Sequence, residues 1–512
     1  FGQNGQALFN AMAIPGWFWE GDAVHAETIL TSQGRGRTPF FFNGFKSLWR
    51  EGRDYNWMKL RNGSLKDYVP DHYYLGYMLV NYGYLKYGND FWKKVTQDAA
   101  SYKSLFYPFQ SAVKKYAGVD FKTFRKQALD YYSHGVSRKR TDVVKRQTVT
   151  NYYFPQYIGD DSLLYLKGSY NKLRAFYIKD KSGEHKLRLM NISTEDWFSY
   201  RNGMIAYTAY ETSPRWSLID YSTIYLYDIY TGKQKKITRK AKYYTPDISP
   251  SGDKIIAVSV NEKTETSLHL LDQTGKLIKV IQPVNHSYFN EPRFIDENTI
   301  VVGERLLNST MQMITIDLTT GSREILIPST SALLGYPFPY KGFIYFVSSV
   351  AGVDDIYALR ISDKKVFEVI SGVTGKYYPS VYNDSLVWSS FTSSGLQLNK
   401  KTAAPGNDVD PQLWKEVKLP YLIANADASN NMLVNNSRRF PVTRYKQGAH
   451  LFNFHSWNPD YTDPEFTLSL YSDNILNTFS NEIYYRYNQN ETSNTVGFNS
   501  SYGGFFPVIN AG

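Results

Sequence analysis

Residues that could do chemistry are few and widely spaced in this chain of 512 residues. There is no cysteine, which excludes a thiol nucleophile, a disulfide scaffold and a zinc site with cysteine ligands. No histidine has another histidine four residues away, so the chain contains no His-Glu-x-x-His zinc helix. A Gly-x-Ser-x-Gly nucleophile elbow, a phosphate-binding loop and a dinucleotide fingerprint are also missing from the sequence. The eight histidines are His25, His72, His134, His185, His269, His286, His450 and His455.

The strongest chemical signal is a carboxylate near the start, in the run Pro15-Gly-Trp-Phe-Trp-Glu-Gly-Asp-Ala23. Its leading proline fits the first position of a helix, on which Glu20 and Glu27 lie seven residues apart and share a face. A second run, Val69-Pro-Asp-His-Tyr-Tyr-Leu-Gly76, places Tyr73 three residues before a glycine at the start of another apolar helix. The simplest interpretation of Glu20 is a helix carboxylate beside a tryptophan-rich packing face.

The first run resembles the second-helix motif of the gluzincin metallopeptidases, (Pro)-x-Trp-(apolar)-x-Glu-Gly-x-Ala, and the second resembles that family's Tyr-x-x-Gly segment. The resemblance implies that Glu20 is the third ligand of a zinc ion held by two histidines of an upstream His-Glu-x-x-His helix. It also implies that Glu27 orients a histidine ligand and that Tyr73 donates a hydrogen bond to the tetrahedral oxyanion. The general base would be the glutamate of that upstream motif.

The missing histidine pair decides what this chain can do alone. Only nineteen residues precede Glu20, so a zinc helix would have to lie before Phe1. We interpret the chain as a piece of a longer protein, because it starts without methionine and ends within a strand-like run. Zn²⁺ is therefore expected in the longer parent only, with no cofactor and no peptidase activity in this piece.

Short β-runs separated by turn residues repeat between residues 142 and 401. The fullest copy, Pro246–Val258, has an entry proline, a tight Ser-Gly-Asp turn and an apolar strand. A second phrase is a strand that ends in an Asp/Thr-Gly hairpin, and it occurs three times. We interpret its aspartates, Asp228, Asp272 and Asp317, as turn formers rather than calcium ligands. Six copies about 40–50 residues apart predict a six-bladed β-propeller, with a β-sandwich as the alternative. The copies begin at Pro155, Asp196, Pro246, Pro292, Pro339 and Pro379.

These phrases resemble the TolB-like propeller repeat, Pro-x-(aromatic)-Ser-Pro-Asp-Gly followed by an apolar strand, over about half of the chain. Only the third copy keeps nearly the whole form, with Ser251 where aspartate is usual. Because a propeller must pair its last edge, the run Asp142–Asn151 is a candidate closing strand for the last blade.

Alternating strands also follow a Pro/Gly/Asp linker near the end of the chain, from Glu465 onward. They are typical of an outer-membrane β-barrel, where one face meets lipid. His450–Pro459 resembles the lead-in of bacterial surface-antigen-type barrels. Two or three strands cannot close a barrel, and a small added β-sheet is the alternative.

The net charge of +11 lies mainly in residues 31–150, which hold 22 Lys and Arg against 9 Asp and Glu. We interpret this as the solvated surface of a helical domain, because no nucleic-acid-binding motif accompanies it, and we expect no nucleic-acid partner. No apolar run is long enough for a transmembrane helix.

Together these patterns predict a multidomain chain. It would consist of a truncated α-helical gluzincin-like domain at 1–136, an all-β six-bladed TolB-like propeller at 142–401, and an antiparallel β segment at 412–512 that starts an outer-membrane barrel. The predicted function is a periplasmic or outer-membrane protein of a Gram-negative bacterium. In it a zinc peptidase domain is coupled to a propeller that binds polypeptide or protein on one face. A non-catalytic scaffold protein of the outer membrane is the alternative.

Overall fold

The computed structural model describes residues 2–31, 33–104, 106–138, 148–214, 219–404, 406–411, 414, 417, 419, 421–424, 441, 443–444, 451–505 and 507–512. The chain forms two compact units. The sheet unit comprises Phe1–Trp19, Lys86–Gln127 and Asn430–Gly512, and the propeller unit comprises Glu20–Leu85 and Ala128–Ser429. The boundary between the two units passes through helices, so the helical part of the chain contributes to both.

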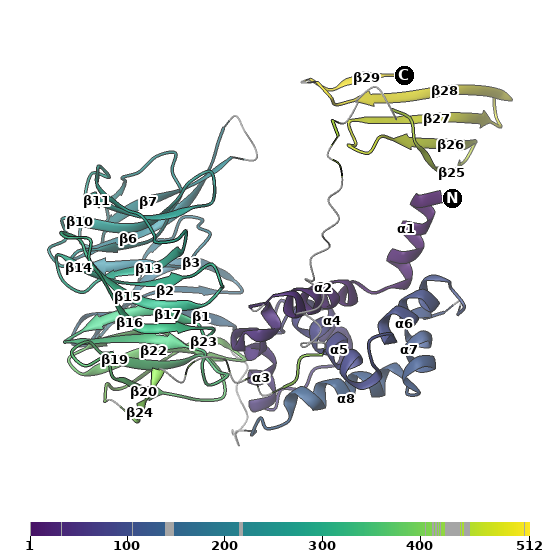
Figure 1. The fold of residues 1–512 in the computed structure, drawn as a ribbon. Coiled ribbons are helices and arrows are strands. Elements are labelled where there is room, and N and C mark those ends of the chain that lie inside the picture. Colours follow the sequence, from purple (N-terminus) through teal and green to yellow (C-terminus); the bar gives the residue numbers. More distant parts are fainter. Residues whose placement is uncertain are drawn as a thin grey trace. The chain divides into compact units, whose positions relative to one another are not determined.

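Helices occupy the first part of the chain (Figure 1), and the two helices expected at the Pro15–Ala23 and Val69–Gly76 runs are both present. The α-helices are α1 (Gly2–Ala13), α2 (Gly16–Leu30), α3 (Asn43–Arg50), α4 (Trp57–Asn62), α5 (His72–Tyr87), α6 (Phe91–Ala100), α7 (Pro108–Ala117) and α8 (Phe121–Ser133), and two 3₁₀ turns cover Arg35–Arg37 and Pro39–Phe42.

An aromatic cluster forms the helical core of the sheet unit. Trp17 stacks on Phe121 at 5.9 Å between ring centroids and meets Phe109 edge-on at 5.5 Å. Trp92 stacks on the other side of Phe109 at 6.0 Å. Large aromatic side chains bury much apolar area with few rotatable bonds, so they fix the start of α2 firmly. The tryptophan-rich face next to Glu20 is therefore packing surface, as its simplest interpretation predicts.

Six antiparallel sheets follow between residues 150 and 409 of the described chain; five have sequential strand order, and the fifth along the chain adds a late short strand at its edge. The first three sheets consist of β1 (Thr150–Gly159), β2 (Ser162–Ser169), β3 (Lys172–Asp180) and β4 (Gly183–Leu189); β5 (Phe198–Arg201), β6 (Met204–Thr212), β7 (Asp220–Asp228) and β8 (Gln234–Lys236); and β9 (Tyr243–Ile248), β10 (Lys254–Val260), β11 (Thr266–Asp272) and β12 (Leu277–Ile281). The next three consist of β13 (Tyr288–Phe294), β14 (Thr299–Arg305), β15 (Met311–Asp317) and β16 (Arg323–Thr330); β17 (Leu334–Tyr340), β18 (Phe343–Ser348), β19 (Asp355–Arg360), β20 (Val366–Ile370) and β24 (Asp408–Val409); and β21 (Lys376–Tyr382), β22 (Ser385–Thr392) and β23 (Gly395–Thr402).

The sheets are arranged around a central axis, which makes this part of the chain a β-propeller. The first strand of each sheet lies innermost. Contacts run from β5 through β9, β13 and β17 to β21 and from β21 to β1, and Phe154 of β1 meets Phe198 of β5 at 6.1 Å between ring centroids. The amide of Thr150 donates to the carbonyl of Ser394 across this closure at 2.9 Å. Residues 142–147 of the candidate closing strand lie outside the described residues, so that prediction stays untested.

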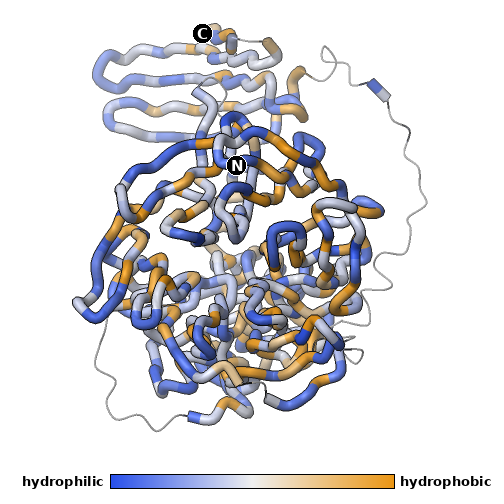
Figure 2. The backbone as a smooth tube through the Cα atoms, turned by 90° about the vertical axis from the view of Figure 1, so that its left-hand side faces the viewer, coloured by the Kyte–Doolittle hydropathy of each residue, from blue (hydrophilic) through white to orange (hydrophobic). Residues whose placement is uncertain are grey.

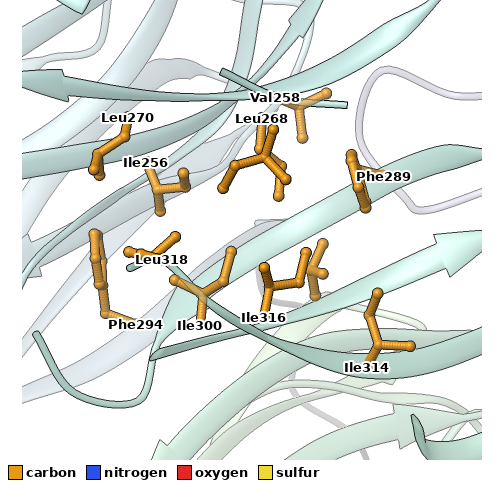
Figure 3. Close-up of a cluster of buried hydrophobic side chains, with 12 residues drawn as sticks. Ile256, Val258, Leu268, Leu270, Phe289, Phe294, Ile300, Ile314, Ile316 and Leu318 are labelled. Atoms are coloured by element: carbon orange, nitrogen blue, oxygen red, sulfur yellow. The ribbon is translucent and has the colours of Figure 1, made fainter. Parts of the chain in front are cut away.

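Apolar side chains from adjacent sheets form the propeller core. Figure 3 shows one such cluster, where Ile256 and Leu268 of the third sheet face Ile300 and Ile316 of the fourth. All four side chains are completely buried. Similar clusters lie between other neighbouring sheets, so the apolar strand of each sequence phrase packs against the sheet before it and the sheet after it. Because both of its faces are buried, that strand does not alternate between apolar and polar residues.

The aspartates of the hairpin phrase do form turns, as predicted. The Oδ1 atom of Asp272 accepts the amide of Thr274 at 2.8 Å, and Asp317 accepts that of Thr319 at the same distance. Gly275 and Gly321 follow with φ values of +87° and +79°, which only glycine adopts without strain. These carboxylates therefore accept hydrogen bonds from the backbone amides of their own turns.

The last strands form a separate five-stranded antiparallel sheet in the sheet unit (Figure 1). Its strands pair in sequence order. The second and third pairings run without interruption over nine and ten residue pairs, and the first has a single irregularity. The chain of hydrogen bonds from Asp473 through His455 to Ser456 ends on the amide of Asn4, so it ties α1 to the sheet. The strands are β25 (Phe454–Thr462), β26 (Glu465–Asp473), β27 (Phe479–Asn488), β28 (Ser493–Tyr502) and β29 (Ile509–Ala511).

Hydrophobic residues are spread in short stretches along the chain (Figure 2). Among the described residues, none of the helices combines the length and apolar character needed to cross a membrane.

Candidate functional site

Helices α2 and α5 touch at two glycines that belong to the two sequence runs singled out above. A Cβ atom added to Gly21 would lie 2.2 Å from the carbonyl carbon of Gly76, closer than any real contact. The two backbones approach this closely only because neither residue has a side chain. As a result, Glu20 and Tyr73 come from neighbouring turns of two helices to the same place.

Glu20 and Tyr73 form a hydrogen-bonded pair at this crossing. The Tyr73 hydroxyl donates to the Glu20 carboxylate, and the bond raises the pKa of Tyr73 because it stabilises the protonated phenol. The start of α5 is fixed by Asp71, whose carboxylate accepts the Tyr73 amide at 2.9 Å. The sequence predicts chemical roles for both residues, and the fold brings the two side chains into contact.

Glu27 lies two turns further along α2 and binds an arginine. Its carboxylate accepts hydrogen bonds from the Nε of Arg35 at 3.0 Å and from the Arg35 backbone amide at 2.7 Å. The same guanidinium lies 5.2 Å from the ring centroid of Tyr73, a cation–π distance. Glu20, Tyr73, Arg35 and Glu27 thus form one polar cluster, which we call the glutamate–tyrosine cluster. The sequence did not single out Arg35, since nothing in its spacing relates it to Glu27.

The described residues do not by themselves fit a zinc ion at this cluster. They include no group of three His, Asp or Glu side chains close enough to hold a metal. His25, on the same helix as Glu20, is buried and stacks on Tyr84 at 4.4 Å, and burial lowers its pKa to about 4. A three-ligand zinc site at Glu20 would need two further ligands from outside these residues.

The Gly21–Gly76 crossing makes a specific prediction. Gly21→Ala should lower the free energy of unfolding by about 1–3 kcal/mol, because its Cβ has no space beside Gly76 and the helices must separate. Gly16→Ala on the same helix is the matched control, since its Cβ would meet nothing within 4 Å. Urea denaturation of both variants tests this. Equal midpoints for the two would show that the close helix crossing is not required.

Helix α3 docks on the propeller through buried polar side chains. The Asn43 amide donates to the Tyr377 hydroxyl at 2.6 Å, and its carbonyl accepts the Gly375 amide at 2.9 Å. Tyr377 in turn donates to Asp354, which is buried, and burial raises the pKa of that carboxyl to about 6. Buried polar groups that are all hydrogen-bonded fix one geometry, so α3 and the propeller form one body here.

Side chains near the centre of the propeller follow one pattern. Five inner strands have a residue with positive φ directly before a proline, and the pairing with the second strand shifts register there. Phe154 and Tyr378, two of these residues, meet at 4.0 Å between ring centroids, and Tyr336 lies 4.9 Å from Tyr378. The equivalent proline of the fifth sheet is therefore Pro337, two residues before the Pro339 predicted from the sequence phrase. Only about 10 Å³ of space remains between these rings and prolines.

A cavity of about 370 Å³ lies between the helices and the same end of the propeller. The propeller contributes tyrosines from its inner strands, and the helical part contributes Phe40, Tyr68 and Tyr74. Tyr74 follows Tyr73 on α5, and Arg35 lies within electrostatic reach of both phenols. The cavity therefore adjoins the glutamate–tyrosine cluster. Its lining residues are Phe40, Gly44, Tyr68, Tyr74, Val149, Asn151, Tyr153, Tyr170, Asp196, Tyr336, Tyr377, Tyr378, Phe391, Gly395 and Leu396.

Two glutamates link neighbouring blades near the axis. Glu195 accepts the amide of Thr245 at 2.8 Å and the hydroxyl of Thr208 at 2.9 Å, and Glu291 accepts the amide of Tyr336. Burial raises the pKa of each carboxyl to about 7, because the low-polarity surroundings disfavour the charged form.

These raised pKa values predict a pH dependence of stability. Each carboxyl ionises near pH 4.5 in the unfolded chain and near 7 when folded, so the unfolded state loses its proton first. The free energy of unfolding should therefore fall as the pH rises from about 4.5 to about 7 and should then level off. Glu195→Gln keeps a side-chain oxygen that can accept hydrogen bonds but has no charge. The variant should therefore depend less on pH and should be more stable than wild type at pH 8. Parallel denaturation curves for the two proteins across this range would contradict the assignment.

The sequence matches no family model and none of the curated proteins. Solved structures similar to this chain include puromycin hydrolase, with 10% identity over 51% of this chain and 55% of that chain and a TM-score of 0.37. TolB from Agrobacterium tumefaciens has 16% identity over 44% of this chain and 83% of that chain, with a TM-score of 0.33. The propeller domain of the trilobed protease from Pyrococcus furiosus has 11% identity over 68% and 95%, with a TM-score of 0.34. The chain thus spans about half of the length of puromycin hydrolase. The propeller assignment comes from the strand pairing within this chain.

Proposed function

We propose that this chain is the polypeptide-binding part of a bacterial cell-envelope protein, in which a gluzincin-like helical domain is seated on a TolB-like propeller of six blades. The observation that carries the proposal is the cavity shared by the helices and the propeller. Aromatic side chains from both line it, and such surfaces bind peptides through large contact area at low entropic cost.

A binding titration with acetylated, amidated random decapeptide pools tests the proposal. Fluorescence polarisation should show saturable binding to the chain. The variant Tyr170→Ala should weaken it, because Tyr170 lines the cavity and is 46% exposed, so its removal disturbs packing little. Tyr230→Ala is the matched control, since Tyr230 is exposed on a blade hairpin and does not line the cavity. Absence of binding, or an equal loss in both variants, would contradict a binding role for the cavity.

The second candidate function is the zinc peptidase that the sequence resemblance implies. The contact between Glu20 and Tyr73 favours it, because the resemblance gives these two residues adjacent tasks, one on the metal and one on the oxyanion. Two ligands would have to come from a longer parent chain. In that parent the peptidase and the peptide-binding cavity would lie side by side within one unit.

The chain alone is accordingly expected to be inactive. Metal analysis after incubation with equimolar zinc chloride and desalting should find well below one zinc per chain, and Glu20→Gln should not change the amount. Casein and labelled-peptide assays should show no zinc-dependent turnover. Stoichiometric zinc that is lost in Glu20→Gln, or turnover that depends on Glu20, would contradict this expectation.

The proposed envelope location rests on the C-terminal sheet. One face of this sheet carries an unbroken apolar row across four strands, formed by Trp457, Leu470, Ile483 and Phe498. All four side chains are exposed to solvent. An apolar face of this kind on nine- and ten-residue strands is typical of the lipid-facing side of outer-membrane proteins, which supports the proposal that this sheet meets the outer membrane.

A further inference from the structure

We infer that the cavity between the helices and the propeller takes a basic side chain, lysine or arginine, of a bound polypeptide. The inference rests on the proposed function and adds the chemistry of the residue recognised. Three features of the cavity support it: the kind of rings that line it, the carboxylate at its edge, and the guanidinium that already binds there.

Tyrosine is the commonest residue of the cavity wall, with seven of the fifteen lining residues. Tyrosine faces carry negative quadrupole charge and attract ammonium and guanidinium groups within about 6 Å of the ring centroid. The volume of about 370 Å³ is near the lower end of known ligand sites, which span roughly 300–1,000 Å³, so it suits one or two side chains. A long alkyl stem with a charged end uses such a site fully, since the stem packs on rings and the end reaches a polar group.

Asp196 supplies the polar group. It lines the cavity, and its side chain is 20% exposed. Burial raises the pKa of this carboxyl, and a nearby cation opposes that rise. Burial raises the pKa of Tyr336 and of Tyr378, and the nearby carboxylates of Glu291 and Asp196 add to that rise. The phenols of the inner wall therefore stay protonated and neutral, and Asp196 is the carboxylate that lines the cavity.

Arg174 shows how a cation binds at this place. Its guanidinium pairs with Asp196 and lies 5.6 Å from the ring centroid of Tyr153, another lining residue. The side chain of Arg174 is 51% exposed, so it keeps about half of its contact with solvent while it binds Asp196. A lysine or arginine of a peptide would make the same two contacts from inside the cavity and displace Arg174 toward solvent.

The test compares random decapeptide pools, acetylated and amidated, whose central residue is fixed as lysine, arginine, norleucine or glutamate. Wild type should bind the lysine and arginine pools about tenfold more tightly than the norleucine pool and should bind the glutamate pool least. Asp196→Asn should abolish this preference, and Arg174→Ala should strengthen binding of the lysine pool because it frees the carboxylate. Asp363→Asn is the matched control, since Asp363 forms an exposed pair with Arg360 away from the cavity and its loss should change nothing.

The outcomes separate this inference from the function on which it rests. Equal binding of all four pools by the wild-type chain, or a preference for the basic pools that survives in Asp196→Asn, overturns the basic-residue inference and leaves peptide binding standing. Failure of every pool to bind overturns the proposed function as well. If Asp196→Asn does not fold, the Arg174→Ala measurement decides alone, because unchanged lysine-pool affinity in that variant contradicts the inference.

Discussion

Replacing Asp247 by alanine is expected to destabilise the propeller by about 3–5 kcal/mol, the cost of leaving a buried charge without its partner. The Oδ1 atom of Asp247 accepts the Nη1 of Arg293 at 2.8 Å, and its other oxygen accepts the amide of Phe294 at 2.8 Å. Asp247 is only 1% exposed, so water cannot replace either bond. The Arg293 guanidinium also lies 4.2 Å from the ring centroid of Trp197, so this carboxylate of β9 holds an arginine of β13 that in turn contacts the residue just before β5.

Urea denaturation followed by tyrosine and tryptophan fluorescence measures this effect. Asp363→Ala is the matched control, because it removes an aspartate–arginine pair in which both side chains are 39% exposed. Exposed pairs contribute about 0–1 kcal/mol, so the control should unfold close to wild type. An Asp247→Ala midpoint as high as that of the control would mean that the blades do not depend on this carboxylate.

Val496→Asp is expected to reduce membrane binding of the chain at least tenfold. Val496 is 77% exposed on the apolar face of the C-terminal sheet, where it pairs across the strand with Tyr485. An arginine or lysine on the lipid-facing side of a membrane strand costs about 2–4 kcal/mol at mid-depth and an aspartate costs less, whereas a tenfold loss of binding needs only about 1.4 kcal/mol. The measurement is flotation of the chain with vesicles of phosphatidylethanolamine and phosphatidylglycerol.

Thr495→Asp provides the control for this experiment from the neighbouring position. Successive residues of a strand point to opposite faces, and Thr495 pairs with Arg486 on the polar side. The same added charge there should leave flotation nearly unchanged. Equal losses in the two variants, or no flotation of the wild-type chain, would contradict the assignment of this face to lipid.

Local patterns predicted much of the fold. The apolar spacing that marked α5 and the Asp/Thr-Gly hairpins of the blades depend on residues close in sequence, and both are present in the structure. The entry phrase of the fifth copy was placed two residues too late, because Leu334–Tyr340 contains two prolines. The positive φ of Tyr336 identifies the first of them as the structural equivalent.

The contacts that assemble the candidate site could not be predicted in this way. Asn43 and Tyr377 are separated by more than 300 residues, and an asparagine in an aromatic run gives no sign that it will be buried. The partner of Glu27 was expected to be a histidine, whereas in the described residues the carboxylate binds Arg35. For Glu20 and Tyr73 the sequence implied related tasks, but their contact depends on the packing of Gly21 on Gly76.

The central claim is that polypeptide binds in the cavity between the helices and the propeller. Its most direct test is photo-crosslinking of a lysine-centred decapeptide pool carrying a benzophenone group, with the crosslinked sites mapped by mass spectrometry. We predict crosslinks at cavity-lining residues of both parts, above all Tyr68, Tyr74 and Tyr170. Crosslinks confined to the outer strands of the blades or to the C-terminal sheet, with none in the cavity, would contradict the account.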